Sequence, residues 1–210
     1  ISPDQFLPVA QEFGLSSRVD LWVLEHTLRF LAAHRERLPG QRFAINLAPS
    51  TVCRVQFPLE VSRVLAKYAI EPWQLIFEVT ECSNFCNAEQ ALHILSQLQK
   101  MGVRIAIDDF GTGHSALIYL EHFTMDYLKI DRGFVNAIGT ETVTSPVLDA
   151  VLTLARRLNM STVAEGVETP EQAAWLREHG VNFLQGYWIS RPMPLAQFRE
   201  WRPDISPEGD

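Results

Sequence analysis

The chain alternates between helical segments and short apolar segments, and this alternation constrains its fold more than any other feature. Short, mostly apolar strands that are separated by helices are typical of parallel sheets whose faces are covered by helices. The sequence therefore predicts an α/β fold. Six strands are expected, at Arg42–Leu47, Leu75–Val79, Arg104–Asp108, Tyr127–Ile130, Thr162–Glu165 and Asn182–Gln185.

Helices are expected before and between these strands, and several carry start or stop signals. Ser2 with Gln5, and Thr169 with Gln172, have the spacing of a capping box, and Gly180 is typical of a helix end. The helices are expected at Pro3–Phe13, Ser17–Arg37, Pro58–Tyr68, Ala88–Met101, Ser115–Glu121, Pro146–Leu158 and Pro170–His179. One face of the sixth helix is formed by Val147, Leu148, Val151, Leu152, Ala155 and Leu158.

Repeated βα units can form either an open doubly wound sheet or a closed (β/α)₈ barrel. A glycine fingerprint that cradles phosphate after the first strand would favour the open sheet, and the sequence lacks it. A complete barrel has eight strands in about 250 residues. Six strands in 210 residues predict a (β/α)₈ TIM-like barrel that is N-terminally incomplete in this chain. We expect one domain over residues 1–202 and a loose C-terminal tail over 203–210.

Composition limits the partners that this chain is expected to have. A formal net charge of −7 argues against binding to a nucleic acid polymer, which needs basic surface. The sequence contains no apolar run of the length that crosses a bilayer, so no membrane contact by this domain is expected. Three cysteines, Cys53, Cys82 and Cys86, without a disulfide framework suggest reduced thiols in a cytosolic setting.

Polar side chains gather at the same end of all the expected strands. The stretch Ile105–Gly113, IAIDDFGTG, carries the clearest example, because adjacent Asp108 and Asp109 would repel each other without a cation between them. In a parallel barrel these strand ends meet on one rim, where barrel enzymes build their sites. The residues at or just beyond the six strand ends are Asn46, Glu78, Glu81, Asp108, Asp109, Lys129, Asp131, Glu165, Glu168 and Gln185.

Oxygen ligands without a His/Cys cluster indicate a hard cation, Mg²⁺, Mn²⁺ or Ca²⁺. Several carboxylates and one Asn could hold two such ions, and a two-metal site suits in-line attack on a phosphodiester. A lysine beside the ions could orient the attacking water. Each residue also has a purely structural interpretation: Asn46 as a turn former, Glu81 and Glu168 as helix N-terminal charges, Lys129 in a salt bridge with Asp131. The joint pattern favours a functional site.

With these motifs in place, the chain closely resembles the EAL-domain phosphodiesterases, which cleave the bacterial second messenger cyclic di-GMP. The resemblance runs from Ser2 to about Pro194. The segments that carry it are Asn46-Leu47-Ala48, Glu78-Val79-Thr80-Glu81, Asp108 through Gly113, Lys129-Ile130-Asp131, Ala164-Glu165-Gly166-Val167-Glu168 and Gln185-Gly186-Tyr187.

The resemblance implies a (β/α)₈-like barrel in which one strand near the start is antiparallel. It implies hydrolysis of cyclic di-GMP to linear pGpG that depends on Mg²⁺ or Mn²⁺, with two ions per site, and that Ca²⁺ inhibits. It also implies a homodimer, an upstream sensor or GGDEF-type domain, and a cytoplasmic location in a bacterial protein that can be membrane-anchored.

The resemblance also assigns roles to residues of this chain. Asp109 resembles a ligand of the second metal, Lys129 the residue that contacts the attacking water, and Glu81 the anchor of the loop after Asp109. Glu168 resembles a residue that supports the site, and Gln185 and Asp131 resemble residues of the ligand pocket. The residues that resemble ligands of the first metal are Asn46, Glu78, Asp108 and Glu165.

Two departures from the family pattern leave alternatives open. The Glu-Ala-Leu motif is absent and is expected upstream of this chain, and His114 stands where the family commonly has Tyr or Phe. If the upstream motif is degenerate, the protein is a cyclic di-GMP receptor that does not cleave its ligand. A third hypothesis is an enolase-like proton abstractor, because acids and a lysine at strand ends also suit that chemistry.

Overall fold

The computed structural model describes residues 2–38, 40–80, 87–110, 123, 125–138, 146–198 and 200–201. The chain divides into two compact units. The first unit contains Ile1–Asp108 and Gly113–Asp126, and the second contains Asp109–Thr112 and Tyr127–Asp210. Both units combine helices with parallel strands, which confirms the α/β prediction.

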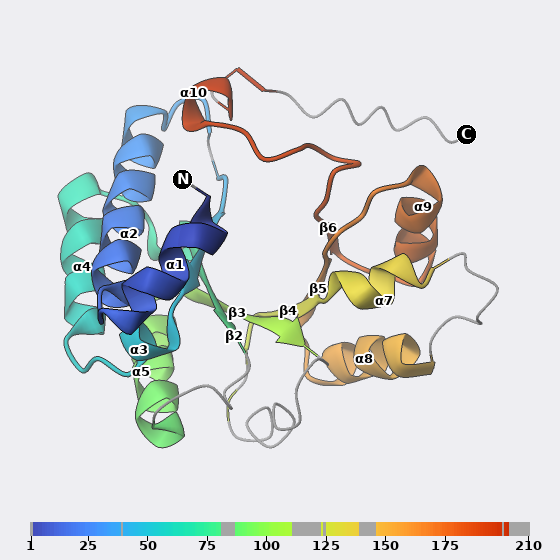
Figure 1. The fold of residues 1–210 in the computed structure, drawn as a ribbon, viewed down its shortest axis with the longest axis horizontal. Coiled ribbons are helices and arrows are strands. Elements are labelled where there is room, and N and C mark those ends of the chain that lie inside the picture. The colour runs from blue at the N-terminus through green and yellow to red at the C-terminus, as the bar shows by residue number, and fades with distance from the viewer. Residues whose placement is uncertain are drawn as a thin grey trace. The chain divides into compact units, whose positions relative to one another are not determined.

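The first unit is built around three parallel strands (Figure 1). They are β1 (Phe43–Leu47), β2 (Leu75–Thr80) and β3 (Arg104–Phe110), and the last two residues of β3 belong to the second unit. β1 pairs with β2, and β2 pairs with β3. All three strands therefore end on the same edge of this sheet.

Helix α2 (Ser16–Ala33) packs against β1 and α4 in the first unit, because a stripe of leucines runs along it. Leu24, Leu28 and Leu31 recur every three to four residues and are buried. The other helical elements of this unit are α1 (Pro3–Glu12), α3 (Pro49–Val52), α4 (Phe57–Tyr68), the 3₁₀ helix η1 (Pro72–Gln74) and α5 (Ala88–Lys100).

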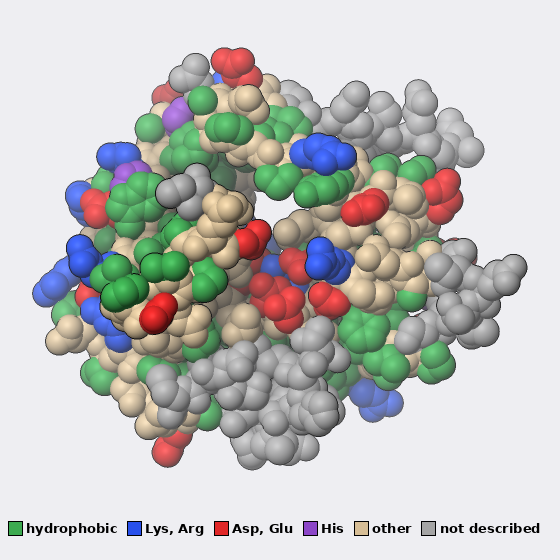
Figure 2. All heavy atoms as spheres, viewed as in Figure 1, with side chains coloured by type: hydrophobic (Ala, Val, Ile, Leu, Met, Phe, Trp, Pro, Cys, Tyr) green, Lys and Arg blue, Asp and Glu red, His purple; other side chains and the backbone are tan. Residues whose placement is uncertain are grey.

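Helix α1 differs from α2 in that large hydrophobic side chains on it are exposed. Leu7 and Val9 are 43% and 51% exposed. Hydrophobic side chains are visible over α1 on the face shown in Figure 2. None of the helices in the part of the chain that the structure describes combines the length and apolar character of a membrane span.

The second unit also has parallel strands: β4 (Tyr127–Ile130), β5 (Ser161–Ala164) and β6 (Phe183–Leu184). Helix α8 packs on β5 and buries Leu148 at the start of its apolar face, whereas Val147 is 52% exposed. The expectation that Val147 shares the buried face is therefore wrong. The helices of this unit are α7 (Arg132–Asn136), α8 (Pro146–Arg157), α9 (Pro170–Glu178) and α10 (Leu195–Phe198).

The predicted capping boxes have opposite outcomes. The box at Thr169 is confirmed, since its side chain accepts from the Gln172 N–H and the Gln172 side chain accepts from the Thr169 N–H. The box predicted at Ser2 is wrong: the Ser2 hydroxyl donates to Asp4 Oδ2 at 3.4 Å, and the Gln5 N–H donates to the Ser2 carbonyl. The nearby Asp4 carboxylate competes for the hydroxyl. The helix expected at 115–121 lies outside the described residues, and the antiparallel strand stays a prediction.

Candidate active site

Three oxygen-bearing side chains come together at the carboxyl ends of the first unit's strands. Asn46 lies opposite Glu78 in the β1–β2 register, and Asp108 is two residues beyond the partner of Glu78 on β3. Since side chains two residues apart share a face of a sheet, all three lie on one face. The Asn46 amide lies 3.2 Å from Asp108 Oδ2 and 3.2 Å from Glu78 Oε2. We call Asn46, Glu78 and Asp108 the first oxygen set.

The orientation of the Asn46 amide determines whether the first oxygen set is stable without a cation. With its nitrogen toward Glu78 and Asp108, the amide donates a hydrogen bond to both carboxylates. With its oxygen toward them, three oxygens from three strands face a common point, which is stable only around a cation. Two carboxylates and one amide oxygen are ligands that Mg²⁺ and Mn²⁺ accept. The donor set therefore fits a hard divalent ion.

Asp109 leaves the regular strand geometry immediately after this set. Its φ of 55° is in the left-handed region, which costs a non-glycine residue about 1–3 kcal/mol, with Asp among the types that tolerate it best. In a regular strand, consecutive side chains point to opposite faces. The left-handed turn at Asp109 breaks that alternation, and the exposed Asp109 carboxylate lines a cavity of the second unit.

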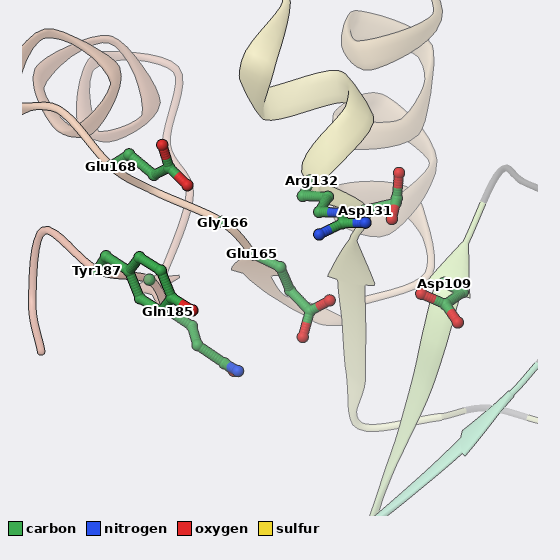
Figure 3. A pocket seen from close by; sticks show the side chains of 9 residues that line it. Asp109, Asp131, Arg132, Glu165, Gly166, Glu168, Gln185 and Tyr187 are labelled. Atoms are coloured by element: carbon green, nitrogen blue, oxygen red, sulfur yellow. The ribbon is translucent and has the colours of Figure 1, made fainter. Parts of the chain in front are cut away.

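This cavity of the second unit has a volume of about 480 Å³. Its wall is formed by residues at or beyond strand ends: the end of β3, the β4–α7 junction, the segment after β5 and the segment after β6 (Figure 3). Four carboxylates and one guanidinium face it, so its charge favours cations. The lining residues are Asp109, Asp131, Arg132, Glu165, Gly166, Glu168, Gln185, Gly186 and Tyr187.

A buried ion pair supports the cavity from inside β4. Lys129 Nζ lies 2.6 Å from Glu165 Oε1, and the two side chains are 3% and 19% exposed. The Glu165 carboxylate also comes within 4.8 Å of the Asp109 carboxylate. We call Asp109 and Glu165 the second oxygen set. Because Asp108 and Asp109 are consecutive, the two sets are joined by a single peptide bond.

Two glycines allow the chain to pass close to its neighbours beside the cavity. Gly166 has φ 68°, and a Cβ there would lie 2.6 Å from Arg132 Cβ. A Cβ on Gly186 would lie 2.2 Å from the Val167 carbonyl oxygen. Both contacts are shorter than atoms can approach, so the cavity wall depends on glycine at both positions.

The structure places three predicted residues at the cavity with defined local contacts. The Asp131 carboxylate caps α7 by accepting from the Gly133 N–H at 2.8 Å. The Glu168 N–H donates to Gln172 Oε1 at 2.8 Å, which ties it to α9. The Gln185 N–H donates to the Ala164 carbonyl at 2.8 Å. Glu81 and His114 lie outside the described residues.

Sequence reasoning did not single out Arg132 and Tyr187 as site residues. Arg132 directly follows Asp131, and Tyr187 is two residues beyond Gln185 in a segment that carries the family resemblance, so this closeness in sequence was the available signal. Arg132 supplies the guanidinium of the cavity, and Tyr187 is 53% exposed with its ring 4.6 Å from the Arg191 guanidinium. These groups add a cation and an aromatic surface to a wall that is otherwise acidic.

A family model and individual relatives identify the same family for this chain. Residues 1–192 match the model of the EAL domain family. The chain is similar to the probable cyclic di-GMP phosphodiesterase PdeN of Escherichia coli K12, with 54% identity over 96% of this chain and 39% of PdeN. It is 50% identical to the cyclic di-GMP phosphodiesterase PdeF of the same organism, over 93% of this chain and 26% of PdeF. The chain thus spans well under half of either relative.

Solved structures are similar over almost the whole chain. A PaMucR phosphodiesterase in complex with c-di-GMP matches with a TM-score of 0.87 and 40% identity, over 94% of this chain and 81% of that one. The EAL enzyme Bd1971, bound to cAMP and cyclic di-GMP, matches with a TM-score of 0.89 and 27% identity, over 95% of this chain and 55% of that one.

Proposed function

Because this chain belongs to the EAL domain family, we propose that it hydrolyses cyclic di-GMP to linear pGpG with Mg²⁺ or Mn²⁺ bound. The observation that carries the proposal is the first oxygen set, in which the Asn46 amide lies 3.2 Å from two carboxylates. With the Asn46 amide oxygen toward the two carboxylates, such a cluster is costly unless a cation joins it. Relatives that are named cyclic di-GMP phosphodiesterases support the choice of substrate over the enolase-like hypothesis.

Both oxygen sets are proposed to hold metal. Asn46, Glu78 and Asp108 are the ligands that the first unit supplies, and Asp109 and Glu165 are those of the second. When bound, the ions would polarise the phosphodiester and lower the pKa of the attacking water. Asp109 has a left-handed backbone, and in this conformation its carboxylate lies within 4.8 Å of that of Glu165.

Lys129 has two proposed tasks in the second unit. Its ammonium donates to Glu165 Oε1 and so fixes the orientation of that carboxylate. An ammonium has three N–H donors, so we propose that another orients the attacking water. Arg132 and Tyr187 present a guanidinium and an aromatic ring to the same cavity, which suit a phosphate and a base respectively.

Further features come from the family alone and stay predictions. They are the homodimer, the inhibition by Ca²⁺ and an upstream sensor or GGDEF-type domain. Glu168 keeps its proposed role of supporting the site, and Gln185 and Asp131 keep theirs in the ligand pocket, because all three line the cavity. Glu81 keeps its proposed role as loop anchor.

The test is hydrolysis of cyclic di-GMP by the full-length protein, with the products separated by chromatography. We expect pGpG in Mn²⁺, none in a chelator, and turnover that is lower by at least about 100-fold in Glu78→Gln and Lys129→Met. Glu89→Gln, an exposed change on α5, is the matched control and should leave turnover unchanged. Tight binding without product would show a receptor instead, and neither binding nor product would overturn the proposal.

A further inference from the structure

Asp20 is a buried carboxylate outside both oxygen sets. It is 8% exposed and begins the stripe on α2 that continues with Leu24 and Leu28. Removing a carboxylate from water is costly unless hydrogen bonds replace its hydration. A leucine or alanine would continue the apolar stripe without that cost. The acid at this position therefore requires an explanation from its contacts.

Both contacts of Asp20 are with the turn that follows β1. Its Oδ2 accepts a hydrogen bond from the Ala48 N–H at 2.9 Å and another from the Thr51 hydroxyl at 2.5 Å. Thr51 is fully buried, so its hydroxyl depends on partners inside the protein. Ala48 is the N-cap of α3 and offers no side-chain oxygen of its own. A single carboxylate oxygen therefore bonds both sides of this turn, and the Thr51 hydroxyl also lies 3.1 Å from Ser17 Oγ on α2.

The held turn begins directly after a residue of the first oxygen set. Ala48 is two residues beyond Asn46, and only Leu47 lies between them. Leu47 is 5% exposed and its side chain is packed in the core. We therefore expect a shift of the Ala48 backbone to move the end of β1, where Asn46 lies. The Asn46 amide, 3.2 Å from two carboxylates, is sensitive to such a shift.

We propose that Asp20 is a positioning residue, which acts from α2 through the Ala48–Thr51 turn to set the Asn46 amide against Glu78 and Asp108. The inference rests on the proposed function, since it concerns the metal affinity of the first oxygen set. Groups that orient metal ligands typically change affinity or activity by about 10- to 100-fold when removed. Asp20 acts by the same logic, with the backbone of one turn as the intermediary.

Asp126 supplies a matched control in the same unit. Its carboxylate also accepts a strand N–H, that of Ile105 at 2.9 Å, and it also bonds the Gln99 amide at 3.0 Å. These hydrogen bonds lie at the start of β3, at the opposite end of the strand from Asp108. Loss of Asp126 should therefore destabilise the fold in the way that loss of Asp20 does, but without moving a metal ligand.

The test measures the dissociation constant of Mn²⁺ by calorimetry in the full-length protein and its variants, beside thermal unfolding. We expect Asp20→Ala to weaken Mn²⁺ binding by about 10-fold or more, and Asp126→Ala to change it by less than about twofold at a comparable loss of stability. Asp20→Asn keeps an acceptor oxygen and should restore most of the affinity. In an Asn46→Ala background, Asp20→Ala should have little further effect, because the two residues act on one ligand.

Three results would overturn the inference: unchanged Mn²⁺ affinity in Asp20→Ala, equal weakening in Asp126→Ala, or additive effects with Asn46→Ala. If Asp20→Ala does not fold, Thr51→Val is compared with Thr51→Ser, which retains the hydroxyl that Asp20 binds. Only Thr51→Val should weaken Mn²⁺ binding, and equal affinities would contradict the inference. If the wild-type protein binds Mn²⁺ but forms no pGpG, the proposed function is refuted. The Mn²⁺ affinities of the variants can still be compared, so the inference about Asp20 is tested separately.

Discussion

At the scale of residues, Lys129 is a buried charge that pairs with a carboxylate. Its side chain is 3% exposed, and its ammonium lies 2.6 Å from Glu165 Oε1. An ammonium in such a position is stable only when a carboxylate and hydrogen bonds replace its hydration. The pair is therefore both a structural contact of the second unit and a part of the proposed site.

Lys129→Met should destabilise the protein by about 3–5 kcal/mol at neutral pH, because it removes the ammonium that lies 2.6 Å from Glu165 Oε1. Adding Glu165→Gln to that variant should recover part of the loss, since the remaining group is then uncharged. Urea unfolding of the wild type, both single variants and the double variant measures the free energy of unfolding of each protein. Strictly additive losses would contradict the pairing.

Gly186→Ala should cost about 3 kcal/mol, because its Cβ would lie 2.2 Å from backbone atoms of Val167 that cannot move independently. Gly14→Ala is the control: Gly14 has φ 64° but nothing within 4 Å of an added Cβ. It should cost only the backbone strain of about 1–2 kcal/mol. Equal losses of unfolding free energy in the two variants would show that the close approach at Gly186 is not tight.

Burial raises the pKa of Asp20 above 3.8, although its bonds to Thr51 and Ala48 oppose the shift. The folded state therefore binds the proton more tightly than the unfolded state, so this carboxyl adds stability below pH 3.8 and loses it as pH rises through the raised pKa. Asp20→Asn has no charge to desolvate. Its stability relative to wild type should be highest at neutral pH and decline on acidification. A stability difference that is constant from pH 7 to pH 3 would contradict this.

At the scale of elements, the start of α9 supports the cavity wall. The Thr169 side chain accepts from the Gln172 N–H at 3.2 Å, and the Gln172 amide oxygen accepts from the Glu168 N–H at 2.8 Å. The cap of α9 therefore also fixes the backbone of Glu168, which lines the cavity.

Thr169→Ala should lower the free energy of unfolding by about 1 kcal/mol, since a backbone N–H at the helix start loses its acceptor. Thr169→Ser keeps the hydroxyl and should remain within a few tenths of wild type. Chemical denaturation of the three proteins makes the comparison. A Thr169→Ala variant as stable as wild type would show that water replaces the cap without loss.

The long helices and the strands could be predicted from the sequence, and the short helices could not. The apolar spacing in α8 predicted Pro146–Leu158, and the structure has Pro146–Arg157. The short helices α3 and α7 lack the length for a periodic signal and form only where a strand ends against its neighbours. Strand β6 was predicted at Asn182–Gln185 but contains only Phe183 and Leu184, the two residues that pair with β5.

At the scale of the whole molecule, the gathering of polar side chains at the strand ends could be predicted from the sequence. Which of these side chains pair with each other could not. Parallel strands place their carboxyl ends on one edge, which predicted Asn46 and Glu78 as neighbours. The pairing of Lys129 with Glu165 and the left-handed backbone of Asp109 depend on tertiary packing, which no local pattern encodes. Asp20 did leave a signal, as a single acid at the head of a leucine stripe.

The central claim is that the two oxygen sets bind hard cations, and direct titration of Mn²⁺ into the full-length protein tests it. We predict about two ions per chain, with one lost or markedly weakened in Glu78→Gln and one in Asp109→Asn. No bound Mn²⁺, or an unchanged binding curve in both variants, would contradict it.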